Sequence, residues 1–154
     1  MRPYADTNLL SRFYLRLSES EAIASWLAKG QALESAPWPV TWLHRIETLN
    51  AFQLYIFAAK MGGQIRVTPE QAAAAHASFQ TDLAQGTFLR PAQIEFPRLE
   101  SQFDELSLRH TAKYGFRTYD LLHVTSALIL ACDACWSLDP KASRLAALEE
   151  LRVR

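Results

Sequence analysis

Short apolar runs with the character of β-strands alternate with longer helical segments along this 154-residue chain. The strand-like runs are Tyr4-Ala5, Pro37 to Trp42, Thr87 to Arg90 and Ala134 to Leu138. Strands that alternate with helices pack as a parallel sheet covered by helices. We therefore predict an α/β fold, a three-layer α/β/α arrangement around a short-stranded, mainly parallel central sheet.

Start and stop signals for helices fill the intervals between these runs. Thr68 is a candidate helix cap, Pro69 suits the first helical position, and Gln71 completes a capping box. The pair Gly62-Gly63 ends the preceding helix. The expected helices are Thr7 to Leu17, Glu19 to Lys29, Leu43 to Lys60, Pro69 to Gln85, Pro97 to Tyr114, Tyr119 to Cys132 and Pro140 to Leu151.

Length and composition indicate a single domain that spans residues 1–154. Hydrophobic residues make up 49% of the chain, enough for a sizeable core. The formal net charge is zero, so binding of nucleic acid requires a local basic patch. Arg2 and Asp6 interrupt any N-terminal signal, and the longest apolar stretch, Leu121 to Cys132, is too short to cross a bilayer. We therefore expect a cytoplasmic protein with no membrane contact.

Four acidic residues stand where a bare carboxylate is unfavourable. Asp6 and Asp139 follow strand-like runs, Glu47 lies in an apolar helical stripe, and Asp120 opens an apolar helix. Ligands of parallel sheets bind at the carboxyl ends of the strands. Carboxylates that gather there repel one another by about 1 to 4 kcal/mol per pair at roughly 4 Å, and Mg²⁺ or Mn²⁺ relieves that repulsion. The four acids therefore predict a shared metal site.

Each acid also has a purely structural interpretation. Asp6 and Asp139 suit helix caps, and Asp120 lies in a first helical turn, where negative charge suits the helix dipole. Glu47 is harder to explain, because an unpaired carboxylate is costly to bury on an apolar helix face. The residues expected on that face are Leu43, Ile46, Asn50, Leu54 and Phe57. The opposite side of the helix, which carries His44, is expected to face solvent.

The cysteines and histidines give weaker signals. Cys132 and Cys135 form a C-x-x-C, but no second pair completes a zinc site. They also lie at a helix-to-strand junction rather than at the start of a helix, as redox motifs do, so we predict packed, reduced thiols. The histidines lack zinc-binding spacing, and no Ser-His-Asp arrangement, P-loop or dinucleotide fingerprint is present. His123, one turn after Asp120, is expected to be hydrogen-bonded in the core or beside the acids.

Four segments in a fixed order carry a pattern that covers nearly the whole chain. They are Tyr4-Ala5-Asp6-Thr7-Asn8, the helical Glu47, Gly115-Phe116-Arg117-Thr118-Tyr119-Asp120-Leu121-Leu122-His123-Val124-Thr125-Ser126-Ala127, and Ser137-Leu138-Asp139. This pattern resembles PIN-domain nucleases, in particular the VapC-type toxins of prokaryotic toxin–antitoxin pairs. The D-L-L-H-V-x-x-A segment, followed by S-x-D after a strand, is its more specific part. The prolines and tryptophans of Pro37 to Trp42 depart from the family pattern.

The resemblance implies a PIN-like domain with Mg²⁺- or Mn²⁺-dependent endoribonuclease activity. It implies Asp6, Asp120 and Asp139 as direct metal ligands. Glu47 would bind the metal through water or orient the attacking water. The residues do not decide between one metal and two, or between RNA and DNA.

The same resemblance implies supporting residues and partners. Asn8, Ser137 and His123 are expected to support the acids. The expected partners are an RNA substrate and a cognate antitoxin protein, and the expected oligomer is a homodimer.

One basic segment is a candidate for RNA binding. Arg109 and Lys113 are expected on one helix face, and Arg117 follows just before the third acid. Tyr114 and Phe116 could stack on unpaired bases. The alternative interpretation is a solvated helix face whose aromatic residues belong to the core.

Two other functions compete with the nuclease. Phosphoryl transfer on an aspartate, as in haloacid-dehalogenase-like phosphatases, needs a second Asp two residues after the first, where this chain has Asn8. The other alternative is a catalytically unused PIN-like module that binds RNA or protein. Acidic residues at all four positions favour the nuclease over the unused module.

Overall fold

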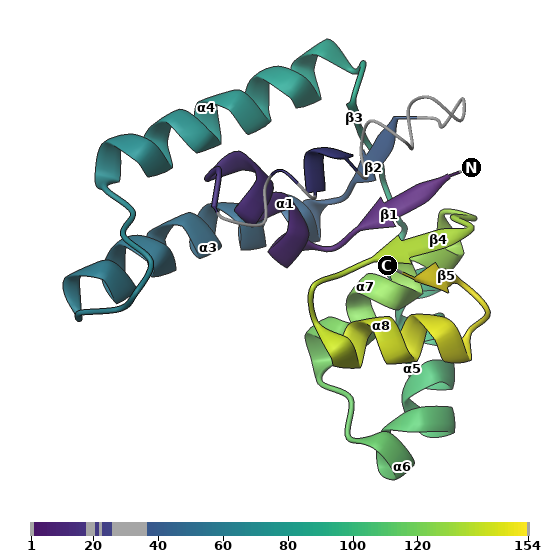
Figure 1. Ribbon diagram of the computed structural model, residues 1–154. Coiled ribbons are helices and arrows are strands. Elements are labelled where there is room, and N and C mark those ends of the chain that lie inside the picture. Colours follow the sequence, from purple (N-terminus) through teal and green to yellow (C-terminus); the bar gives the residue numbers. More distant parts are fainter. Residues whose placement is uncertain (1, 18–20, 22, 26–36, 154) are drawn as a thin grey trace.

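The computed structural model describes residues 2–17, 21, 23–25 and 37–153 (Figure 1). Strands and helices alternate along the chain, so the fold is mixed α/β, as predicted. In chain order the elements are β1 (Pro3–Ala5), α1 (Thr7–Tyr14), β2 (Trp38–Val40), α3 (Trp42–Lys60), α4 (Pro69–Gln85), β3 (Leu89–Pro91), α5 (Phe96–Leu106), the π-helical turn η1 (Ser107–Thr111), α6 (Ala112–Tyr114), α7 (Thr118–Ile129), β4 (Ala134–Trp136), α8 (Pro140–Leu148) and β5 (Arg152–Val153).

Among the described residues every strand pair is parallel, but the strands form two ladders rather than the single central sheet predicted. One ladder has the order β1-β4-β5 and the other pairs β2 with β3. Pro3 in β1 and Pro39 in β2 have no N–H to donate to a ladder. At the end of β1, the Ala5 carbonyl instead accepts a hydrogen bond from Nε2 of His44, at 2.8 Å. A side chain of α3 therefore binds the backbone at the end of β1.

Helices pack on both sides of β1 and β4, because successive strand residues face opposite ways. Ala5 and Trp136 belong to one core cluster, which α1, α3 and α4 complete. Tyr4 and Cys135 belong to a second cluster, formed with α5, α7 and α8. Figure 1 shows the two groups of helices with the strands between them.

The predicted element bounds are confirmed where local signals set them. Thr68 caps α4 through the predicted capping box with Gln71, and the helix ends at Gly86 in the left-handed conformation, φ 69°. The predicted helix Pro97 to Tyr114 is instead interrupted by η1. The predicted helix Glu19 to Lys29 lies largely outside the described residues. The two-residue strand β5 was not predicted, since its exposed residues carry no strand pattern.

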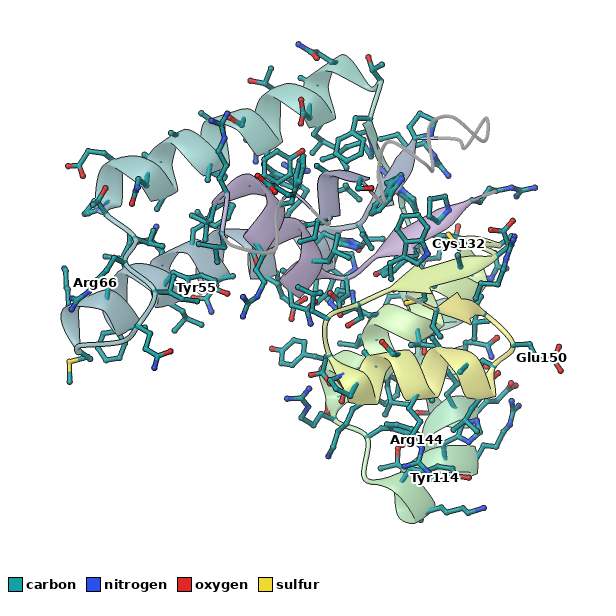
Figure 2. All side chains as sticks on the ribbon, viewed as in Figure 1. Tyr55, Arg66, Tyr114, Cys132, Arg144 and Glu150 are labelled. Carbon is teal, nitrogen blue, oxygen red and sulfur yellow. The ribbon has the colours of Figure 1, made fainter. Side chains whose placement is uncertain are left out.

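Both cysteines are free and buried, as predicted. Burial raises the pKa of the Cys132 thiol to about 12 and also raises that of Cys135. Figure 2 shows Cys132 among the packed side chains near the strands. In the described part of the chain, no helix combines the length and apolar character needed to cross a membrane.

Candidate active site

Asp6 follows β1 and is buried, with 4% of its surface exposed. Its Oδ1 caps α1 by accepting hydrogen bonds from the backbone N–H groups of Asn8, at 3.0 Å, and Leu9, at 3.2 Å. Its Oδ2 accepts a short hydrogen bond from the Ser137 hydroxyl. Burial raises the pKa of Asp6, although the charge of His123 and the hydrogen bond from Ser137 oppose the rise. The predicted capping role is thus confirmed, and one carboxylate oxygen still faces the loop after β4.

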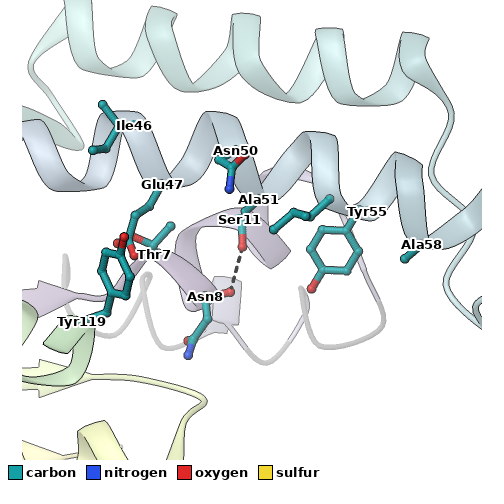
Figure 3. Close-up of a pocket in the computed structure, with 11 residues that line it drawn as sticks. Thr7, Asn8, Ser11, Ile46, Glu47, Asn50, Ala51, Tyr55, Ala58 and Tyr119 are labelled. Atoms are coloured by element: carbon teal, nitrogen blue, oxygen red, sulfur yellow. Dashed lines mark hydrogen bonds between the residues drawn. The ribbon is translucent and has the colours of Figure 1, made fainter. Parts of the chain in front are cut away.

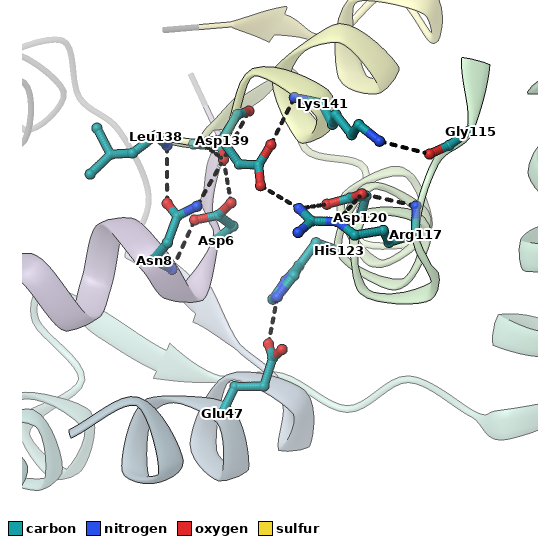
Figure 4. A network of polar contacts seen from close by, with 11 residues as sticks. Asp6, Asn8, Glu47, Gly115, Arg117, Asp120, His123, Leu138, Asp139 and Lys141 are labelled. Atoms are coloured by element: carbon teal, nitrogen blue, oxygen red, sulfur yellow. Dashed lines mark hydrogen bonds and ion pairs between the residues drawn. The ribbon is translucent and has the colours of Figure 1, made fainter. Parts of the chain in front are cut away.

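Asp120 and Asp139 are joined by one arginine. Arg117 donates from its backbone N–H and Nε to Oδ2 of Asp120, at 3.0 and 3.1 Å, and from Nη2 to Oδ1, at 3.0 Å. The same Nη2 also donates a short hydrogen bond to Oδ2 of Asp139 (Figure 4). Oδ1 of Asp139 caps α8 by accepting from the backbone N–H of Lys141, at 2.8 Å. Partial burial raises the pKa of Asp139, but the hydrogen bonds from Lys141 and Arg117 outweigh it, and the pKa lies below its ordinary value.

Glu47 is held by two side chains, Thr7 and His123. Its Oε2 accepts from the Thr7 hydroxyl at 2.9 Å and lies 2.6 Å from Nε2 of His123. A carboxylate only accepts, so Nε2 carries the proton. The other ring nitrogen, Nδ1, lies 2.9 Å from the buried Tyr4 hydroxyl. His123 therefore links the core of the domain to the Glu47 carboxylate.

Asn8 and Ser137 fix the loop between β4 and α8. The Asn8 side chain accepts from the backbone N–H of Leu138 at 3.0 Å and donates to the Ser137 hydroxyl at 3.4 Å. That hydroxyl also accepts from the backbone N–H of Asp139, at 2.9 Å. The three residues expected to support the acids, Asn8, Ser137 and His123, thus all contact them or their loops.

One cavity of about 260 Å³ brings the four acids together. Its lining comes from α1, α3, the start of α7 and the start of α8. The lining residues are Asp6, Thr7, Asn8, Glu47, Arg117, Tyr119, Asp120, His123, Asp139 and Ala142. The gathering of these acids was predicted from their places at strand ends and on helices.

The donor set fits a hard divalent cation by its chemistry, since every ligand offered is a carboxylate oxygen. In the described part of the chain, however, no three acidic, His or Cys side chains converge closely enough to hold a metal ion as they stand. Each carboxylate points instead at a protein donor, as Figure 4 shows for Glu47 with His123 and for Asp120 with Arg117.

The predicted environment of Glu47 is wrong in one respect. Ile46, Leu54 and Phe57 share its helix face but are 56%, 57% and 61% exposed. Helix α3 buries the face that carries His44 and Phe52, and both of these side chains are fully buried. The polar His44 is accepted there because each ring nitrogen has a partner in the core. Glu47 is therefore partly buried at the edge of an open apolar face.

That open face forms a second cavity of about 770 Å³ beside the acids (Figure 3). The two cavities share Thr7, Asn8, Glu47 and Tyr119. The rest of the lining comes from α1 and α3 and consists of Ser11, Ile46, Asn50, Ala51, Leu54, Tyr55 and Ala58.

The structure does not place the predicted basic segment on one free surface. Arg109 donates to the Glu149 carboxylate at 2.8 Å, and the π-helical turn that carries Arg109 alters its spacing from Lys113. Phe116 is buried, 5% exposed, so it cannot stack on a base. The Tyr114 ring is flanked by Lys113 and by Arg144, which lies 4.4 Å from the ring centroid (Figure 2). Of the three predicted RNA-binding residues, only Arg117 lines the acidic cavity.

Sequence reasoning missed three residues that position the site: Tyr4, Thr7 and His44. Thr7 lies inside the Asp6-Thr7-Asn8 motif, so the sequence did indicate that it belongs to the site. Tyr4 and His44 act through partners far apart in the chain, and no local pattern marks them. Comparison of the chain with protein-family models and with curated proteins gives no match.

Proposed function

We propose that this protein is a Mg²⁺- or Mn²⁺-dependent endoribonuclease of the PIN-domain, VapC type. The observation that carries the proposal is the single cavity lined by Asp6, Glu47, Asp120 and Asp139. These are the positions that the sequence resemblance assigns to the catalytic acids. The parallel strands between two helical groups support the same proposal at the level of the fold.

The chemistry follows from what each side chain can hold. Asp6, Asp120 and Asp139 would bind the divalent cation, whose charge, when bound, stabilises negative charge on a phosphodiester. Glu47 has one oxygen, Oε2, engaged by Thr7 and His123. Its Oε1 receives no hydrogen bond from a described side chain and is the atom that takes a proton from the attacking water. His123 holds this carboxylate in place.

The proposed biological role is that of the toxin in a type II toxin–antitoxin pair. In that role the protein forms a homodimer, cleaves RNA to arrest growth, and is held in check by a cognate antitoxin protein. The α3 face beside the acids offers exposed apolar side chains, including Ile46, Leu54 and Phe57, to a protein partner.

A cleavage assay tests the enzymatic part of the proposal. Purified protein should cut single-stranded RNA with Mg²⁺ or Mn²⁺ and stop when EDTA is added. Asp6→Asn should lose this activity by at least about 100-fold, because Asn caps a helix about as well as Asp but binds a hard cation poorly. The matched control is Asp104→Asn, which removes an exposed carboxylate on α5 and should cut as well as the wild type.

A growth assay tests the toxin part. Wild-type chain induced alone in a bacterial host should slow growth, and Asp6→Asn should relieve the effect at an equal level of soluble protein. Equal toxicity of the two proteins would reject catalysis through Asp6. If wild type neither slows growth nor cuts RNA with either metal, the catalytically unused binding module becomes the better account.

A further inference from the structure

One nitrogen atom of Arg117 lies between two of the four acids. Nη2 donates to Oδ1 of Asp120 at 3.0 Å and, at the same time, to Oδ2 of Asp139. Nε and the backbone N–H of Arg117 hold the other oxygen of Asp120. The guanidinium thus bridges residues from the starts of two different helices, α7 and α8 (Figure 4).

The bridging position is the one that a divalent cation requires. Mg²⁺ sits about 2.1 Å from its oxygen ligands, whereas Nη2 lies 3.0 Å from the Asp120 oxygen. A cation bound to both carboxylates would draw their oxygens inward, onto the place that Nη2 fills. The two positive groups would also repel each other at this separation. They cannot share the two oxygens.

We propose that Arg117 is a built-in competitor of the divalent cation, and that the cation binds to Asp120 and Asp139 only as the guanidinium leaves them. This inference rests on the metal-binding part of the proposed function. It assigns to Arg117 a role different from RNA binding: Arg117 sets the cation concentration at which the site fills.

The exposure of Arg117 explains why it, rather than the donors to the other acids, is displaced by the cation. Its side chain is 61% exposed, whereas that of Asp120 is 5% exposed. The exposed guanidinium regains water when it leaves, and the incoming cation compensates the buried Asp120 carboxylate, which would otherwise be left without a partner. The donors to the other two acids, Ser137 and His123, are buried and fixed by further contacts. The backbone N–H of Arg117 can keep its bond to Asp120 while the side chain departs.

Calorimetric titration with Mn²⁺ measures the competition directly. Arg117→Gln removes the charge and should lower the Kd for Mn²⁺ at least tenfold. The matched control is Arg109→Gln, which removes an exposed arginine paired with Glu149 and should keep the Kd within twofold of wild type. A Kd in Arg117→Gln that is equal to or higher than the wild-type value would overturn the proposal, because Arg117 would then be neutral or would order the ligands. Absence of Mn²⁺ binding in both proteins would overturn it too.

A second measurement uses the wild-type chain, so it does not depend on the folding of a variant. The Nε–H signal of Arg117 in ¹H–¹⁵N spectra should move on titration with Mg²⁺ and saturate with the Kd that calorimetry gives for Mg²⁺. A signal that stays in place while the cation binds would refute the displacement. Neither measurement contains RNA, so tighter Mn²⁺ binding without RNA cleavage would reject the nuclease alone, and cleavage with unchanged affinity would reject the competition alone.

Discussion

His44 gives the fold a defined sensitivity to acid. The ring is fully buried. Its Nε2 lies 2.8 Å from the Ala5 carbonyl, which can only accept, so Nε2 carries a proton. Its Nδ1 lies 3.1 Å from the backbone N–H of Thr41, which can only donate, so Nδ1 is unprotonated. A second proton on the ring would face that N–H, and the folded chain therefore holds the neutral form.

The magnitude follows from the pKa difference between the folded and unfolded chain. Burial, with a further contribution from the charge of His123, lowers the pKa of His44 from 6.5 to about 3. Above the unfolded value both states are neutral and the full stability is present. As pH falls below that value, His44 binds a proton in the unfolded chain but not in the folded chain. Between pH 7 and pH 5, uptake of this proton by the unfolded chain should lower the free energy of unfolding by about 2 kcal/mol.

Urea unfolding of wild type and His44→Gln at pH 7 and pH 5 measures this effect. Gln keeps a donor for the Ala5 carbonyl but does not titrate. The loss of stability between the two pH values should be smaller by about 2 kcal/mol in the variant, whatever its stability at pH 7. Arg45→Gln, a neighbouring change on the exposed side of α3, should keep the wild-type loss. Equal losses in wild type and His44→Gln would refute this account of the histidine.

Three further predictions concern other sites. Cys132 and Cys135 should react with a thiol reagent at pH 8 only after unfolding, because burial covers them and raises the pKa of both thiols. Thr68→Ala should lower the unfolding free energy by about 1 kcal/mol in urea, through loss of the α4 cap. In EDTA at pH 7, Asp6→Asn should raise Tm, because burial disfavours its ionised form, whereas Asp139→Asn should lower Tm, because hydrogen bonds to its ionised form outweigh its partial burial. Shifts of Tm in the same direction for both variants would contradict the last prediction.

The elements that the sequence predicts well are those set by neighbouring residues. The start of α4 depends on Thr68, Pro69 and Gln71, which interact within one turn. Its end depends on Gly86, whose positive φ suits a residue without a side chain. The meeting of Asp6 and Asp139 was also predictable, because they follow parallel strands whose carboxyl ends lie at the same edge.

What the sequence does not predict depends on partners distant in the chain. Helix α3 is apolar on more than one side, so periodicity alone does not tell the buried face from the exposed one. The buried face carries His44, whose acceptor is the carbonyl of Ala5, 39 residues earlier. Likewise, Arg117 lies near Asp120 in sequence, but its bond to Asp139 depends on how α7 and α8 pack.

The donors to the four acids separate them into two kinds. Asp6 and Glu47 accept side-chain hydrogen bonds from the buried residues Ser137, Thr7 and His123. Asp120 and Asp139 share the exposed charge of Arg117. In the proposed site, a divalent cation would bring twice that charge and would also bind Asp6. We therefore expect the cation to replace the arginine that bridges Asp120 and Asp139, while the buried donors to Asp6 and Glu47 keep their places.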